Sequence, residues 1–133
     1  MPERAENDLA QIGLTTEGQR DLEAVLKTGW FATGQDAYLL AIGVALANGL
    51  IATPEQVRGA ETRYNFFGGI DKDGKVRALI AALRPGDAAV PARTAERLAH
   101  AGLAVLARKL SEEDAMLSEA LGYREETEIG SSG

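Results

Sequence analysis

The pattern of apolar positions predicts a chain made mainly of helices. Residues 9–14 alternate between two faces, which favours one short strand. Elsewhere apolar side chains recur every three or four residues, which is the spacing of one helix face. The predicted helices cover residues 17–28, 35–48, 54–64, 76–83, 92–110 and 112–121. We therefore expect a mainly α fold: a compact bundle of about six short-to-medium helices with at most one short N-terminal strand.

Several helix starts carry a recognisable capping signal. Thr16 with Gln19, and Thr53 with Gln56, fit the box in which each residue's side chain bonds the other's backbone N–H. Ser111 is expected to begin a separate last helix in the same way.

The segment 37–47 has only one polar side-chain group, the hydroxyl of Tyr38. A helix that is apolar on every side must be covered on every side. It is therefore either the central helix of the chain or half of a subunit interface, and the sequence leaves both readings open. For the second reading, a homodimer, we expect the interface residues to be Leu40, Gly43, Val44 and Ala47.

Composition narrows the chemistry. A chain of 133 residues suggests one domain, and the absence of cysteine excludes disulfides, thiol catalysis and thiolate metal sites. One histidine, His100, excludes multi-histidine metal sites within one chain. We find no cluster of acid and base residues on one face, so we expect no catalytic residues, no metal and no cofactor, and a protein that is more a binding module than an enzyme.

Charge is unevenly distributed along the chain. The formal net charge is −6, and the segment 111–133 is strongly acidic, whereas the segment 51–110 is net basic. A basic stretch favours phosphate groups, so nucleic acid is a candidate partner. The residues expected to bind nucleic acid or another anion are Arg77, Arg93, Arg97 and Arg108. The alternative is an ordinary surface of mixed sign, since acidic residues are interleaved.

Domain organisation follows from the same features. We expect a flexible N-terminus over residues 1–8, a single helical domain over 9–122 and a disordered acidic and Gly/Ser tail over 123–133. The longest apolar run has eleven residues, and about twenty are needed to span a membrane. The N-terminus lacks the apolar core of a secretion signal. The expected location is therefore the cytoplasm, with no membrane partner.

Two motifs resemble known sites only in part. Residues 69–76 nearly match a phosphate-binding loop, but Val76 replaces the hydroxyl residue that holds Mg²⁺, and Asp71 and Asp73 would repel phosphate. A calcium loop beginning at Asp71 fails as well, because Ala82 occupies the position of its last glutamate. We interpret this segment as a solvated turn that caps the next helix.

His100 follows Glu96 by one helical turn, a spacing that could raise the histidine pKa. We interpret it as a surface or capped residue and not as a proton carrier.

Aromatic residues gather at the ends of predicted helices. Trp30, Tyr64 and Phe67 could line a pocket for a small molecule, although such residues more often close the ends of a helical core. We therefore predict a non-enzymatic helical interaction or accessory protein, dimeric and able to contact nucleic acid. The alternative is a small-molecule-binding protein or enzyme with a pocket near these three aromatic residues.

The order of elements over residues 9–48, a short strand followed by two helices, resembles the ribbon-helix-helix DNA-binding family. In that family the strand pairs with its twin in a dimer, and the second helix builds the dimer core. The resemblance implies that residues 37–47 are covered by a second copy. It also implies a DNA-reading strand face that would correspond here to Leu9, Gln11 and Gly13, of which only Gln11 could bond a base edge.

Overall fold

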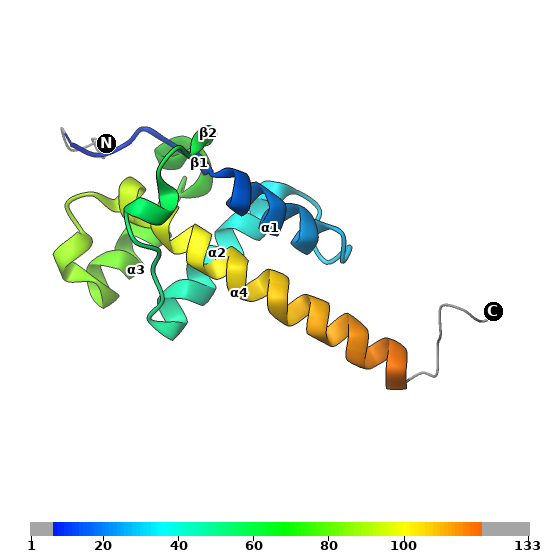
Figure 1. The fold of residues 1–133 in the computed structure, drawn as a ribbon. Helices are drawn as coiled ribbons and strands as arrows, with labels where there is room; N and C mark the ends of the chain where they lie inside the picture. The colour runs from blue at the N-terminus through cyan, green and yellow to red at the C-terminus, as the bar shows by residue number, and fades with distance from the viewer. Residues whose placement is uncertain (1–6, 121–133) are drawn as a thin grey trace.

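The computed structural model describes residues 7–120, with side chains up to Glu113. Within this range the fold is mainly α-helical, with one short antiparallel pair of strands, which confirms the predicted fold class (Figure 1). The elements are β1 (Gln11–Leu14), α1 (Thr16–Leu26), α2 (Gly34–Asn48), β2 (Glu61–Asn65), α3 (Lys75–Leu83) and α4 (Pro91–Ala120), with 3₁₀ turns at Glu55–Val57 and Pro85–Asp87 and a π-helical turn at Phe66–Ile70.

The longest helix, α4, lies across α2 and organises the core (Figure 1). The two backbones approach most closely at Gly102, where an added Cβ would overlap the carbonyl group of Ala41. Around this crossing the core is filled by apolar side chains from both helices, including Tyr38, Ile42, Leu98 and Leu103. Helix α1 packs against α4 as well, so α4 contacts most of the other elements.

Only one side of α2 is covered within the chain. The buried residues are Ala37, Tyr38, Ala41, Ile42, Ala45 and Leu46. On the opposite side Leu39, Leu40 and Ala47 are exposed, and Gly43 and Val44 are half-buried. The segment 37–47 is thus a helix, as predicted, with one apolar side inside the fold and the other at the surface.

The strand β1 pairs with β2 of the same chain, with an irregularity between Ile12 and Gly13. Gly13 is tightly enclosed: its N–H donates to the Glu96 carboxylate at 2.9 Å, and its carbonyl accepts from the Tyr38 hydroxyl at 3.0 Å. The strand–helix–helix order of the ribbon-helix-helix resemblance is therefore present, but the strand has its partner within the chain. Neither backbone group of Gly13 is left for a twin strand.

The segment 54–64, predicted as a helix, is instead a single 3₁₀ turn followed by β2. The predicted capping box does form, since Gln56 N–H donates to Thr53 Oγ1 and Thr53 N–H donates to the Gln56 side chain. The turn ends at Arg58, whose backbone is extended, and Gly59 follows in a left-handed conformation with φ +82° before the chain runs along β1. The start signal at Thr53 is therefore correct, but the helix does not continue because the following residues pair with β1 as strand β2.

The predicted break at Ser111 is also absent, because α4 continues through it to Ala120. No glycine or proline lies between Leu103 and Ala120, and a serine inside a helix costs little. The last turns of α4 extend beyond the other helices (Figure 1). A smaller shift concerns α1, whose N-cap is Thr15 and not Thr16, with Thr15 Oγ1 accepting from Gly18 N–H.

Asp8 lies at the boundary of the segment predicted to be flexible. Its side chain is buried, and its two carboxylate oxygens accept the N–H groups of Ala92 and Arg93. These amides belong to the first turn of α4, where no intrahelical acceptor exists and a negative charge is favourable. Residues 1–6 and 123–133, the other parts of the predicted flexible ends, lie outside the described residues.

None of the helices in the described part of the chain has both the length and the apolar character that crossing a bilayer demands.

The contact between Gly102 and Ala41 gives a first prediction. Replacing Gly102 with Ala should lower the free energy of unfolding by about 3 kcal/mol, because the added methyl group meets backbone and not a movable side chain. Urea unfolding followed by circular dichroism measures this. The control is Gly86→Ala, where an added Cβ meets nothing within 4 Å. Equal stability of the two variants would show that α2 and α4 can separate without cost.

Candidate functional site

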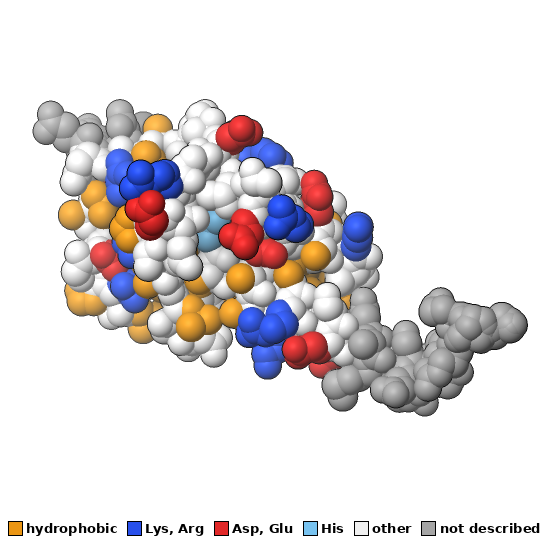
Figure 2. All heavy atoms as spheres, viewed as in Figure 1, with side chains coloured by type: hydrophobic (Ala, Val, Ile, Leu, Met, Phe, Trp, Pro, Cys, Tyr) orange, Lys and Arg blue, Asp and Glu red, His pale blue; other side chains and the backbone are white. Residues whose placement is uncertain are grey.

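A largely apolar cavity at the surface lies between α2 and α3. It has a volume of about 600 Å³. Its apolar lining comes from both helices and the turn before α3, and includes Leu39, Leu40, Gly43, Ile70 and Leu79. We call this cavity, together with the exposed Leu83 at the end of α3, the α2–α3 face. Figure 2 shows hydrophobic side chains reaching the surface over α3, at the left of the view.

The leucines of this face are exposed although the helices that carry them are well packed. Leu40 is 44% exposed and Leu79 46% exposed, whereas Val76, which lines the same cavity, and Ile80 are buried. Of the interface residues predicted from the sequence, Leu40 and Gly43 line the cavity, Val44 is half-buried beside it, and Ala47 is exposed one turn further along. Leu79 and Leu83 were missed as interface residues, although both belong to the apolar repeat of segment 76–83.

Helix α3 is held in place by Asp71, which is fully buried. The two carboxylate oxygens of Asp71 accept the N–H groups of Val76 and Arg77, the first amides of the helix. The guanidinium of Arg77 completes the arrangement, with its Nε 2.6 Å from the carboxylate. The interpretation of this segment as a cap for the next helix is therefore correct. The expectation that it is solvated is wrong for Asp71, because its charge is compensated inside the fold.

Charged side chains border the α2–α3 face. Asp36, Lys72, Asp73 and Lys75 all line the cavity, so acidic and basic residues are equal in number. Asp73 lies 3.6 Å from the Lys75 ammonium, and the backbone N–H of Lys75 lowers the Asp73 pKa by hydrogen bonding to its carboxylate. Asp36 and Lys72 make no ion pair with any other residue that the structure describes.

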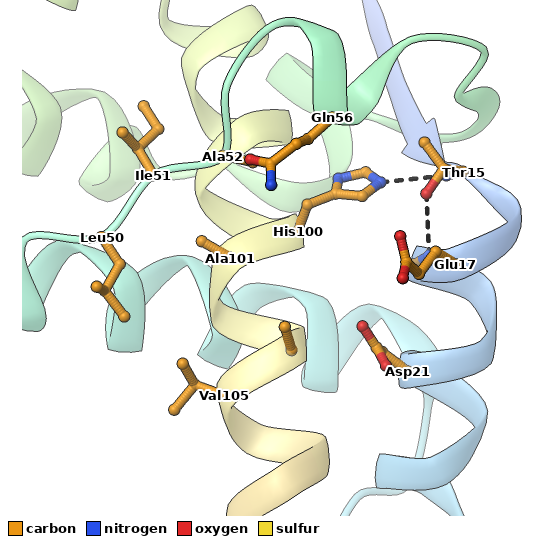
Figure 3. Close-up of a pocket in the computed structure, with 12 residues that line it drawn as sticks. Thr15, Glu17, Asp21, Leu50, Ile51, Ala52, Gln56, His100, Ala101 and Val105 are labelled. Atoms are coloured by element: carbon orange, nitrogen blue, oxygen red, sulfur yellow. Dashed lines mark hydrogen bonds between the residues drawn. The ribbon is translucent and has the colours of Figure 1, made fainter.

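A second hollow, between α1 and α4, contains His100 (Figures 2 and 3). Its volume is about 390 Å³. Glu17 and Asp21 reach it from α1, Gln56 from the 3₁₀ turn, and Leu50, Ile51 and Val105 supply apolar walls. Burial raises the Asp21 pKa, and the neighbouring Glu17 carboxylate adds to that rise.

Both ring nitrogens of His100 are already in use. Nε2 accepts the backbone N–H of Thr15 at 3.1 Å, so the ring proton lies on Nδ1 and is donated to the Glu96 carbonyl at 2.8 Å. The ring also packs against Gly18, where an added Cβ would lie 2.8 Å from it. His100 is thus a neutral structural residue. The expected rise in its pKa is wrong: burial lowers the pKa, and that effect outweighs the hydrogen bond to Glu96.

Glu96 performs a similar structural task one turn earlier on α4. Its carboxylate is buried and accepts the Gly13 N–H, and burial raises its pKa. Glu96 and His100 together hold the junction of β1 and α1 against α4. Both ring nitrogens of His100 and one carboxylate oxygen of Glu96 are therefore engaged with backbone groups.

Three of the four arginines predicted to bind anions contact their own chain. Arg77 pairs with Asp71, Arg93 Nε donates to the Asn7 carbonyl, and Arg97 Nε donates to the Ala52 carbonyl at 2.7 Å. Arg108 is exposed on α4. Arg77 lies on α3 and the other three lie on α4, so the arginines belong to two different helices. Nucleic-acid binding through them stays a prediction.

The three aromatic residues of the alternative pocket have different surroundings. Trp30 lies in the α1–α2 loop and is 73% exposed. Tyr64 packs on the buried Tyr38, with ring centroids 4.9 Å apart. Phe67 lies against Phe66 and beneath the Arg77 guanidinium. Tyr64 and Phe67 thus contribute to the edge of the core. No three acidic or histidine side chains of the described region are placed to hold a metal ion.

The bonds of His100 give a prediction about pH. Its folded-state pKa lies below the ordinary 6.5, so the stability that the neutral ring confers is present above that pH and is lost as the pH falls below it. Between about pH 7.5 and about pH 5.5 the wild type should lose about 1 kcal/mol more than His100→Gln, which keeps an acceptor but does not titrate. Urea unfolding at both pH values measures this.

The pH test is a difference between two variants because Glu96 and Asp21 also titrate. Their raised pKa values act in the opposite sense, since they favour the folded state as the pH falls. Both groups are present in wild type and variant, so the difference reports on His100 together with its charge interaction with Asp21. Equal losses in the two proteins would contradict the assigned role.

Comparison of the chain with models of protein families, with curated proteins and with solved structures finds no match. The function therefore has to be inferred from the chain's own residues and their geometry.

Proposed function

We propose that this protein is a non-enzymatic interaction module that associates with a second copy of itself through the α2–α3 face. The observation that carries the proposal is the exposure of large apolar side chains from two adjacent helices. Leu39, Leu40, Leu79 and Leu83 are each more than two-fifths exposed. A contiguous apolar patch bordered by charges is typical of a protein-binding surface.

The centre of the face favours a helix as the occupant. Gly43 is half-buried, and an added Cβ there would meet nothing within 4 Å, so the surface is open above it. Ala47 follows one turn later on the same side. Small residues spaced by four allow another helix to approach α2 closely, and the flanking leucines supply the apolar area to be covered.

The charges at the border favour a second copy over a polyanion. Two acidic and two basic side chains line the cavity, so the face carries no net charge of its own. The whole chain has a formal net charge of −6, which opposes the approach of phosphate groups. A surface with both signs can complement itself across a two-fold axis.

A catalytic role is less well supported. The one histidine and the buried Glu96 hold backbone amides, and their hydrogen bonds already explain their positions. Glu17 and Asp21 line the same groove as His100, and both ring nitrogens of that histidine are already in hydrogen bonds. A protein-binding role explains why the leucines of the α2–α3 face are exposed, and it requires no catalytic group.

The proposal predicts a dimer that one charge can break. In sedimentation at micromolar concentration the wild type should have about twice the mass of the chain, and Leu40→Glu should be a folded monomer, because a carboxylate cannot be buried unpaired at a helix contact. Leu40 is already half exposed, so the fold itself should tolerate the change. Circular dichroism checks this.

The matched control is Ala104→Glu, which places the same charge at an exposed position of α4 outside the α2–α3 face. This variant should remain dimeric. A wild type that sediments as a monomer at all concentrations tested would refute the proposed function.

A further inference from the structure

Two side chains at the border of the α2–α3 face have opposite charges and no ionic partner among the described residues. They are Asp36, in the first turn of α2, and Lys72, in the turn before α3. Both line the cavity, and both are exposed. The other two charges of the border, Asp73 and Lys75, already lie beside each other. Asp36 and Lys72 are therefore the charges of this border that are available to a partner.

We propose that the two copies pair about a two-fold axis, with Asp36 of each copy contacting Lys72 of the other. This inference rests on the proposed function, and it adds the register in which the two faces meet. In a two-fold contact each pair occurs twice, because residue i of one copy meets residue j of its partner and the reverse. One acid and one base on the face of each copy are therefore enough to form both contacts.

The two pairs select the orientation of the helices more than they add affinity. Ion pairs at the border of an interface stay partly hydrated, so each contributes little, whereas two like charges brought together are clearly unfavourable. The apolar face alone would allow α2 to slide or turn along its partner. Matching charges at Asp36 and Lys72 exclude the arrangements in which like charges meet.

The test uses two charge reversals. Asp36→Lys leaves two positive residues at these positions, and Lys72→Glu leaves two negative ones. Each variant alone should dimerise about tenfold more weakly than the wild type, because both cross-contacts become repulsive. Sedimentation at one fixed total concentration compares each variant with their equimolar mixture.

The mixture should regain wild-type association. In a mixed dimer the reversed position 36 of the first variant, now basic, faces the reversed position 72 of the second, now acidic. At the other contact the unchanged Lys72 of the first variant faces the unchanged Asp36 of the second. Both contacts therefore again join opposite charges.

The mixture also separates a contact between copies from damage within one copy. Asp36→Lys places a cation at a helix N-terminus and could weaken α2, but such damage would persist after mixing. The control is Lys27→Glu, an exposed reversal at the C-cap of α1 away from the face, which should dimerise like the wild type and gain nothing from mixing with Asp36→Lys.

The outcomes distinguish the register from the function itself. Recovery in the mixture supports the proposed contact. If both reversed variants dimerise like the wild type, or if they weaken and the mixture does not recover, then the register is wrong and the dimer through the α2–α3 face still stands. If the wild type is monomeric, both proposals fail together.

Discussion

The fold depends on how closely α4 can approach α2. At their crossing, Gly102 lies against the backbone of Ala41, and no other amino acid would leave room for that distance. Around this crossing the small residues Ala41, Ala45, Ala95 and Ala99 are fully buried beside larger side chains such as Tyr38 and Leu98. This core covers one side of α2 and leaves the other side, with Leu39 and Leu40, at the surface.

A second consequence of the position of α4 is that it can bond backbone groups far away in sequence. Glu96 and His100, one turn apart, accept the N–H groups of Gly13 and Thr15. These bonds satisfy amides at the start of α1 and in the irregular part of β1 that strand pairing alone leaves open. Gly18 has to lack a side chain because the His100 ring occupies that space. The polar residues that resemble catalytic groups in the sequence are therefore part of the scaffold.

The helices whose signals are local could be predicted from the sequence, and the contacts between distant residues could not. The predicted ranges 35–48 and 76–83 lie within one residue of α2 and α3, because apolar periodicity and helix caps, here Thr33 and Gly49 for α2, act over a few residues. The strand β2 was missed because its residues pair with β1 from a distant part of the chain, and the start at Thr53 is locally a helix start. For the same reason no local pattern indicated that His100 would meet Thr15, and its pKa was expected to shift in the wrong direction. The apolar pattern of residues 37–47 was enough to indicate the α2 side of the candidate interface. Whether Leu79 belongs to the interface depends on how α3 is oriented, which its sequence does not determine.

The enclosed Gly13 also bears on aggregation. A two-stranded sheet presents edges to which strands of other molecules can add, and such additions lead to fibrils. Here the Gly13 amide donates to Glu96 and the Gly13 carbonyl accepts from Tyr38. A strand of another molecule that paired with β1 could therefore not form its hydrogen bonds at Gly13. The pairing strand β2 carries the charges of Glu61 and Arg63, which discourage growth on its side. The occupied backbone groups of Gly13 and the charges on β2 thus disfavour the addition of a foreign strand at either edge of the two-stranded sheet.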